Sequence, residues 1–189
     1  MKRLRLGLCA LLLLAGCVTR QPDRFYVLEP QPAAIAEPRS QFDRQVVLSV
    51  TIPSLLDRGE MVITTSSGVA VMDHERWGAP LADLIAASLS QDIERRRGDV
   101  VVLPKSANKA GIPIVRVTVE IDRVTARLGD HLSIETHWRV TEAGTGKETV
   151  GRDAFTSQQQ AQTYAEVAVA LSSCVAHLAD RLAGLIPQP

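Results

Sequence analysis

Residues 113–128 read PIVRVTVEIDRVTARL, and their alternation is the strongest structural signal in the chain. Apolar side chains occupy every second position from Val115 to Ile121, with polar ones between them. Side chains of a strand point alternately to opposite faces, so this pattern predicts a long strand with one apolar face. From Val124 onward the apolar residues occupy even-numbered positions, which predicts a bulge or bend near residues 122–123.

Further strands are predicted on both sides of this segment. Residues 131–141 repeat the alternation, a turn follows at Gly144-Thr145-Gly146, and residues 148–156 form the return strand. The remaining predicted strands are residues 25–28, 45–52, 61–65, 69–72 and 99–103. The third and fourth of these segments are expected to form a hairpin around Ser66-Ser67-Gly68.

The first predicted helix spans residues 80–97, where apolar side chains recur at helical spacing. Pro80 suits the first turn, because its missing N–H is not needed there. Three arginines in the last turn complement the helix dipole, and Gly98 is expected to end the helix.

A second helix is predicted for residues 163–186 from its broad apolar stripe. Thr163 and Glu166 have the spacing of a capping box, and Gly184 and Pro187 are expected to end the helix. The fold class that follows is α/β. We expect a two-layer sandwich, a mostly antiparallel mixed sheet with two amphipathic helices packed on one face.

The N-terminus resembles the signal sequence of a bacterial lipoprotein. A basic start and the apolar run of residues 6–14 precede Leu14-Ala15-Gly16-Cys17, which resembles a lipobox. We expect cleavage between Gly16 and Cys17, with a diacylglyceryl thioether on Cys17 and an acyl group on its freed amine. Residues 1–16 are then the signal peptide, 17–24 a lipidated tether, and 25–187 a single domain.

The composition of the mature chain excludes several classes of function. The signal peptide contains three of the 21 basic residues and none of the 21 acidic ones, so 18 basic residues face 21 acidic ones. The net charge of −3 gives no electrostatic reason to bind nucleic acid.

With Cys17 acylated, only Cys174 remains, so no internal disulfide can form. Cys174 lies on an apolar helical face and is expected to be a small buried hydrophobe.

Several fragments resemble catalytic or metal-binding motifs but lack an essential part. His74-Glu75-Arg76-Trp77-Gly78 lacks the second histidine of a zinc-protease motif, and residues 144–147 lack the spacing of a phosphate loop. His131 and His137 could collect a metal with Glu135, although solvated polar side chains are the more common case. We therefore expect neither catalysis nor a metal, and no cofactor apart from the lipid on Cys17.

The order and spacing of short motifs give the chain a family resemblance. The chain resembles the ABC-type transport auxiliary lipoproteins, also called the paraquat-inducible protein C (PqiC) family. Leu55 is a departure, because the family's pattern has an aromatic residue there. The residues that carry the resemblance are Cys17, Phe25, Tyr26, Leu28, Pro53, Leu56, Asp57, Arg58, Arg76, Trp77, Pro80 and Leu81.

The resemblance implies an outer-membrane lipoprotein facing the periplasm. Its implied role is that of an auxiliary or adaptor subunit in a system that moves lipids between the two membranes. The implied partners are an MCE-domain protein and an ABC or related inner-membrane transporter. A non-acidic Val18 after the lipidated cysteine agrees with export to the outer membrane.

Three points stay open at the level of sequence. The chain could instead be a periplasmic lipid carrier, which would need a concave apolar pocket. The alanine-rich second helix fits either a close neighbour, such as another subunit, or simple helix propensity. Trp77 is interpreted as a core residue that packs at the start of the first helix, with contact to a partner as the alternative.

Overall fold

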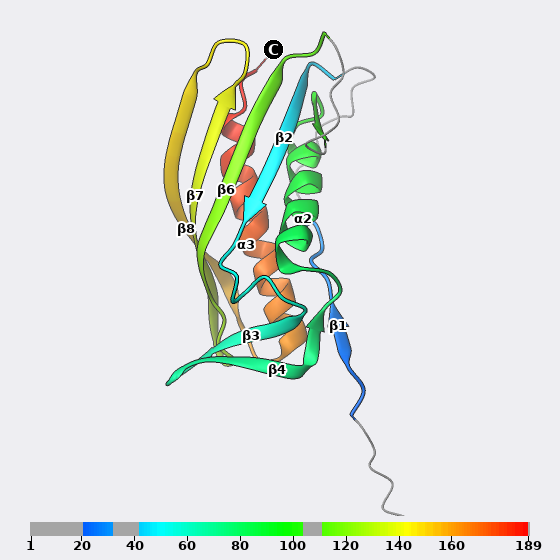
Figure 1. Cartoon of the computed structure of the whole chain (residues 1–189), viewed down its shortest axis with the longest axis vertical. Helices are drawn as coiled ribbons and strands as arrows, with labels where there is room; N and C mark the ends of the chain where they lie inside the picture. The colour runs from blue at the N-terminus through cyan, green and yellow to red at the C-terminus, as the bar shows by residue number, and fades with distance from the viewer. Residues whose placement is uncertain (1–20, 32–41, 104–110, 189) are drawn as a thin grey trace, which may run out of the picture.

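The computed structural model describes residues 21–31, 42–103 and 111–188 (Figure 1). Gly16 and Cys17, and most of the predicted loop after residue 29, lie outside this range. The elements are β1 (Arg24–Tyr26), β2 (Arg44–Thr51), β3 (Glu60–Thr65), β4 (Gly68–Trp77), α2 (Leu81–Arg96), β5 (Val100–Leu103), β6 (Ile114–Thr125), β7 (Asp130–Glu142), β8 (Glu148–Ala161) and α3 (Tyr164–Leu185).

The strands divide into two sheets, a feature that the sequence analysis did not predict. The larger sheet has the order β5-β2-β6-β7-β8 and the smaller one has the order β1-β4-β3. Strand β2 runs parallel to β5 and β6, and β1 runs parallel to β4, whereas the other pairs are antiparallel. The predicted α/β class, with a mixed sheet and two helices, is confirmed.

The alternating apolar residues of β6 form a buried face, as predicted. Val115, Val117, Val119 and Ile121 are buried, and the register against β7 shifts between Ile121 and Arg123. A bulge at this point turns the strand, so the apolar side chains beyond it again face inward. The backbone N–H of Thr64 in β3 donates to the carbonyl of Ala126, just beyond β6, and so joins the two sheets.

The first helix ends where it was predicted to end, and the second does not. Helix α2 ends at Arg96, directly before its cap residue Arg97 and Gly98. The Arg97 guanidinium binds the Asp99 carboxylate at 2.7 and 2.9 Å. The same guanidinium donates to the carbonyls of Ala183 and Ile186, and this ties the ends of the two helices together. Gly184 lies within the last turn of α3 and does not end the helix.

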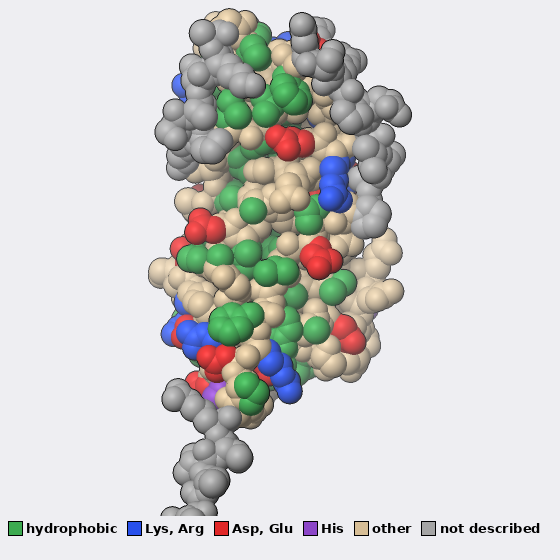
Figure 2. Space-filling model, turned by 90° about the vertical axis from the view of Figure 1, so that its right-hand side faces the viewer, with side chains coloured by type: hydrophobic (Ala, Val, Ile, Leu, Met, Phe, Trp, Pro, Cys, Tyr) green, Lys and Arg blue, Asp and Glu red, His purple; other side chains and the backbone are tan. Residues whose placement is uncertain are grey.

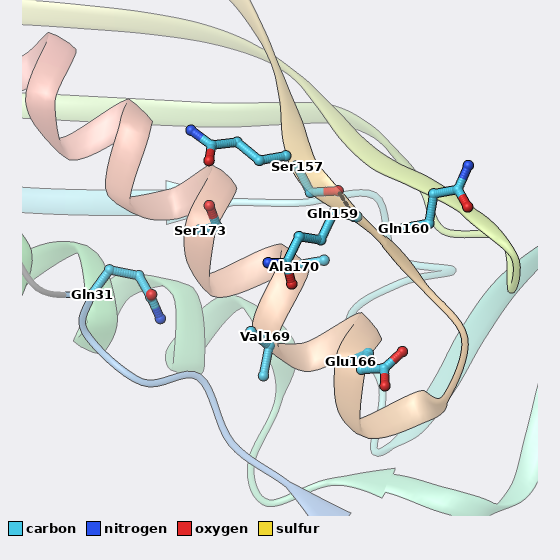
Figure 3. A pocket seen from close by; sticks show the side chains of 9 residues that line it. Gln31, Ser157, Gln159, Gln160, Glu166, Val169, Ala170 and Ser173 are labelled. Carbon is cyan, nitrogen blue, oxygen red and sulfur yellow. Dashed lines mark hydrogen bonds between the residues drawn. The ribbon is translucent and has the colours of Figure 1, made fainter.

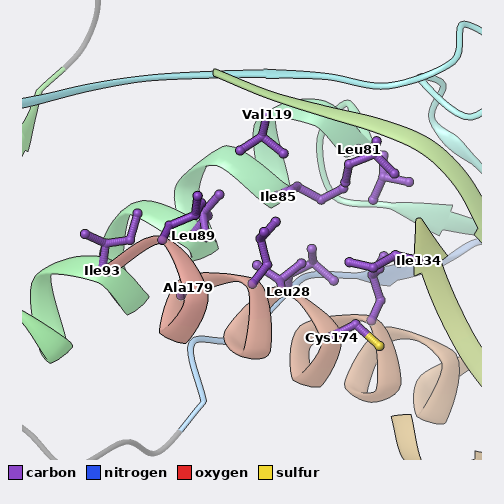
Figure 4. Packing of buried hydrophobic residues seen from close by; sticks show 14 of the residues in the cluster. Leu28, Leu81, Ile85, Leu89, Ile93, Val119, Ile134, Cys174 and Ala179 are labelled. Atoms are coloured by element: carbon purple, nitrogen blue, oxygen red, sulfur yellow. The ribbon is translucent and has the colours of Figure 1, made fainter. Parts of the chain in front are cut away.

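Helix α3 is the central element of the core. The predicted capping box of Thr163 and Glu166 is present at its start. By length and composition α3 could cross a membrane, but 67% of its most apolar window is buried inside the protein, as in the core helix of a folded domain. Cys174 is fully buried on this helix, as predicted. Figure 4 shows α2 and α3 with their apolar side chains between them.

The molecule is elongated, and its two ends differ. Strands β1, β3 and β4 lie at one end of the long axis, where the N-terminal chain departs. The β7–β8 turn and the C-terminus lie at the opposite end (Figure 1). Any anchor on the N-terminal chain would therefore hold the molecule by the end with the smaller sheet.

Candidate functional site

The residues before the core, 23–31, cross the small sheet and then the two helices. We call this segment the N-terminal strap. Its strand β1 pairs in parallel with the end of β4, with Arg24 opposite Glu75 and Tyr26 opposite Trp77. The carbonyl of Tyr26 also accepts a hydrogen bond of 2.7 Å from the backbone of Gly78. The strap is thus part of the sheet and is not a free linker.

A buried carboxylate holds the inner side of the strap. Glu75 is 6% exposed and accepts hydrogen bonds from the Tyr26 hydroxyl at 2.6 Å and from Arg24 at 3.2 Å. Burial, together with the hydrogen bond and negative charge of Glu75, raises the pKa of the Tyr26 phenol above its ordinary 10.0. On the outer side, the Asp23 carboxylate lies 3.1 Å from Nδ1 of His74. Three contacts between side chains therefore fasten the beginning of the strap to β4.

The second half of the strap packs against the two helices. Leu28 is 8% exposed and belongs to the main core, and Figure 4 shows it between α2 and α3. The backbone N–H of Glu29 donates to the Ser172 hydroxyl at 3.1 Å. Arg95 of α2 donates to the carbonyl of Pro30 at 3.4 Å. The strap thus contacts both helices as well as the small sheet.

Small residues on α3 let the strap approach. Ala168, Ser172 and Ala176 share one face of the helix at four-residue spacing, and all three are buried. Ser172 contacts the strap directly and donates its own proton to the carbonyl of Ala168 at 2.8 Å. A neighbour within the same chain therefore accounts for this part of the alanine-rich pattern.

The Leu56-Asp57-Arg58 motif connects the strap's sheet to helix α2. The Pro53 carbonyl accepts from Leu56 and Asp57 and closes the turn. Asp57 accepts a hydrogen bond of 3.3 Å from the backbone of Ala82 in the first turn of α2. Because Pro80 provides no side-chain cap, this carboxylate from a distant loop satisfies one of the free N–H groups there.

A network of charges covers the outer side of the same region. Glu60 accepts from Arg58 at 3.0 Å and from Arg76 at 2.9 Å. The hydrogen bond from Arg58 is the main cause that lowers the pKa of Glu60 below 4.5. Arg76 also lies 4.0 Å from Asp23, so the network reaches the strap.

Trp77 and Leu81 lie beneath this network in the core. Trp77 is 5% exposed, in agreement with the interpretation as a core residue. Together with Leu56 and other core side chains, the two residues line an apolar space of about 10 Å³. This volume is about that needed for a single water molecule.

The structure thus brings most of the motif residues together at one end of the molecule. The strap supplies Phe25, Tyr26 and Leu28, the loop after β2 supplies residues 53–58, and the segment from β4 to α2 supplies residues 76–81. Phe25 also lies at this end, but its side chain is mostly exposed and does not pack in the core.

Sequence reasoning missed Glu75 and Ser172. It ended the second hairpin strand at residue 72, because Asp73-His74-Glu75-Arg76 is charged, whereas β4 continues to Trp77. Glu75 stands two residues before a tryptophan and so shares its face, which was the available signal. Ser172, a polar residue among the small residues of an apolar helix, was the second signal.

Two larger hollows open on the surface of the molecule. One, of about 220 Å³, lies between β8 and α3 beside Gln31 at the end of the strap, and four glutamines, Ser157, Ser173 and Glu166 provide its polar groups (Figure 3). Glu166 is engaged by the backbone N–H groups of Gln162 and Thr163, and the Ser157 hydroxyl donates to the carbonyl of Gln159. The hollow offers hydrogen bonds but no hydroxyl paired with a free base.

The second hollow, of about 560 Å³, is open and lies on the face of the large sheet away from the helices. His137 lines it, with Nδ1 toward Asp122 and Nε2 accepting from Arg152 at 2.7 Å. Both ring nitrogens are therefore occupied. His131 contacts the carbonyl of Ser157 instead, and no three metal-ligating side chains gather anywhere in the described ranges.

Comparisons with known proteins agree with this architecture. A protein described only as uncharacterized shares 18% identity with a TM-score of 0.66, covering 88% of this chain and 100% of that one. A Xanthomonas campestris protein of the DUF330 family shares 16% identity with a TM-score of 0.59, covering 86% and 93%. At these identities the likeness shows the fold. The search of curated proteins gave no match.

A family model assigns the sequence more specifically. The model, described as ABC-type transport auxiliary lipoprotein component, matches residues 26–183, from the middle of the strap to near the end of α3. The resemblance found in the sequence is therefore confirmed. The chain belongs to the family of ABC-type transport auxiliary lipoprotein components, which are lipoproteins of the cell envelope.

Proposed function

We propose that the protein is anchored in the outer membrane through lipid on Cys17 and acts in the periplasm as an adaptor. Its partners would be an MCE-domain protein and an ABC or related inner-membrane transporter that together move lipid between the membranes. Membership of the transport auxiliary lipoproteins supports the role. The lipobox-like Leu14-Ala15-Gly16-Cys17 and the non-acidic Val18 support the anchor and its membrane.

The fastening of the strap is the observation on which this proposal depends most. Asp23 already contacts the folded body, so only residues 18–22 remain as a linker after Cys17. A flexible linker would let the domain move freely beneath the membrane. A strap held by Glu75, His74 and Ser172 instead transmits the position of the anchor to the core. An adaptor that must present one surface to a partner benefits from this restriction.

The dimensions of the core argue for an adaptor over a carrier. Pockets that enclose small ligands typically measure on the order of 300–1,000 Å³ and are largely apolar. The apolar space beside Trp77 measures about 10 Å³, and the hollow of about 220 Å³ between β8 and α3 is bordered by several glutamines and Glu166. The hollow of about 560 Å³ falls within the typical size range, but it is open to solvent, and Glu120, His137 and two arginines stand among its apolar side chains. A lipid chain would need the core to open.

We also propose that the protein is not an enzyme. In the part of the chain that the structure describes, Ser157 and His137 are each engaged with groups that leave them no nucleophilic or basic role. Cys174 is buried, and burial raises the pKa of its thiol to about 12, so the reactive thiolate is scarce.

Replacing the anchor cysteine tests the proposal. Cys17→Ser should leave the fold intact, release the protein from the outer membrane and abolish complementation of a deletion at native expression. The measurements are membrane fractionation, circular dichroism and co-isolation of an MCE protein after mild crosslinking. Full complementation by the released variant would contradict the anchored role. Lipid found by mass spectrometry in the unacylated protein would favour the carrier instead.

A further inference from the structure

Exposed apolar side chains gather at the end of the molecule from which the N-terminal chain departs. We call this end, formed by β1, β3 and β4, the strap end. Phe25 is 66% exposed, Val27 54% and Val69 52%. Phe25 points away from the face of β1 that carries Arg24 and Tyr26, because side chains alternate along a strand, and Val27 follows directly after β1. Val69 follows the β3–β4 turn, which reaches the same end of the long axis (Figure 1).

The charges at the strap end compensate one another. Arg24 pairs with Glu75, and Arg58 and Arg76 both pair with Glu60. Arg76 also lies 4.0 Å from Asp23, so three arginines face three carboxylates. Figure 2 shows basic, acidic and apolar side chains mixed around the place where the chain leaves the body. The β3–β4 turn, residues 65–69, carries no charge. Such a surface has no strong field to attract an acidic or a basic partner.

The length of the chain before the strap limits what this surface can meet. From Cys17 to Asp23 an extended chain reaches about 20 Å, and Asp23 is fixed to the body through His74. A lipid on Cys17 would therefore hold the strap end within that distance of the membrane. The polar headgroup region is itself roughly 5–8 Å thick on each side of the bilayer. An apolar side chain at this height has the headgroup boundary within reach.

We propose that the strap end rests on the surface of the lipid bilayer, with Phe25 and Val69 in the headgroup region. This inference rests on the proposed anchor at Cys17 and adds a second contact with the same membrane. Aromatic and aliphatic side chains gain free energy at the interface by leaving water. Because the charges around them are balanced, the contact needs no anionic lipid and is insensitive to salt. Insertion at Phe25 and at Val69, in addition to the lipid anchor, fixes the tilt of the molecule's long axis relative to the bilayer.

Site-directed spin labelling tests this arrangement on the full acylated protein in phosphatidylcholine vesicles. The variants are Phe25→Cys and Val69→Cys, each labelled with a nitroxide. The native cysteines do not interfere, because the sulfur of an acylated Cys17 is blocked and Cys174 is buried with a pKa of about 12. The matched control is Val150→Cys. Val150 is 58% exposed and lies near the start of β8, at the opposite end of the molecule.

The measurement compares collisions of each label with oxygen, which concentrates in the bilayer, and with a water-soluble nickel complex. We expect the ratio of oxygen to nickel collisions to be several-fold higher at residues 25 and 69 than at residue 150. The ratio should be the same at low and high salt. Two labelled sites on different strands guard against a local disturbance of β1 by either substitution.

The other outcomes separate the contact from the anchor. If the protein stays on the vesicles while the labels at 25 and 69 remain as water-accessible as that at 150, the bilayer contact is wrong and the anchor stands. If the labels become shielded only when an MCE protein is added, the occupant is a protein and the proposal is overturned. If the protein does not stay on vesicles and mass spectrometry finds Cys17 unmodified, anchor and contact both fail.

Discussion

Single residues decide which side chains neighbouring strands can place opposite each other, and Gly151 is the clearest case. A Cβ built on Gly151 would overlap the ring of Trp138. The ring is held in that place, since its Nε1 donates to Asp153 at 2.6 Å and the Arg181 guanidinium lies 5.4 Å from its centroid. Strand β8 can accept the tryptophan of β7 only where it has no side chain.

Substituting this glycine is therefore expected to destabilise the fold. Gly151→Ala should lower the free energy of unfolding by about 1–3 kcal/mol, because the ring must leave its partners or the strands must separate. Gly144→Ala is the control, since a Cβ there meets no atom within 4 Å. Urea unfolding of both variants checks the prediction. Equal stability of the two variants would contradict it.

A second prediction for a single residue concerns Asp92 and the pH dependence of the free energy of unfolding. Burial raises the pKa of this carboxyl above 3.8, although the neighbouring Arg96 opposes the shift. The folded state then binds the proton more tightly than the unfolded chain. The contribution of this group to stability is complete below the unfolded pKa and declines as the pH rises through the folded pKa.

Replacing Asp92 by an uncharged isostere should remove this decline. The free energy of unfolding of Asp92→Asn, relative to the unchanged protein, should become more favourable as the pH rises from about 4, the ordinary value for aspartate, toward neutrality. Urea unfolding at a series of pH values measures this difference. A difference that becomes less favourable with rising pH would show that the ion pair with Arg96 dominates instead.

At the scale of elements, the strap is a short segment that is held in place by its contacts with the small sheet and the two helices. Three residues of β1 could not hold an edge by themselves, and Leu28 supplies the apolar contact that keeps the segment in place. Removing that contact should free the strap while the sandwich persists, since the two helices still cover the large sheet.

Leu28→Ala tests this dependence. Deleting a buried leucine side chain typically costs about 2–5 kcal/mol, and the lower part of that range applies here because a strap can relax. Hydrogen exchange should accelerate in residues 24–31 more than in β6 or α3. Val27→Ala is the matched control, since the neighbouring side chain is mostly exposed and its loss should leave exchange nearly unchanged. Uniform acceleration across the molecule would mean that the strap is not a separate unit.

Local patterns predicted most of the elements, and long-range pairings explain the rest. Alternation from Val115 to Ile121 was enough to predict β6 and its bulge, because the faces of a strand follow from sequence order alone. The division into two sheets depends on β1 pairing with β4, some fifty residues away, which no local pattern reports. For the same reason Glu75 was missed, because its partners Arg24 and Tyr26 come from that distant strand.

On the scale of the whole molecule, the protein is an elongated body with the strap fastened at one end. The strap joins the small sheet and both helices into one mechanical unit, while the β7–β8 turn lies at the far end (Figure 1). With lipid on Cys17, as we propose, the short linker of residues 18–22 would set both the height and the freedom of the body at the membrane. Its length should matter more than its sequence.

The most direct test of this claim is a change of linker length. Ten glycine and serine residues inserted between Gln21 and Pro22 leave the anchor and the fold in place but release the body from the membrane surface. The control carries the same insertion in the β7–β8 turn, between Gly144 and Thr145. Complementation of a deletion at native expression, read as restored resistance of the envelope to detergent, is the measurement. We expect the linker insertion to abolish complementation and the turn insertion to preserve it, whereas full complementation by the long linker would contradict the claim that the strap positions the protein.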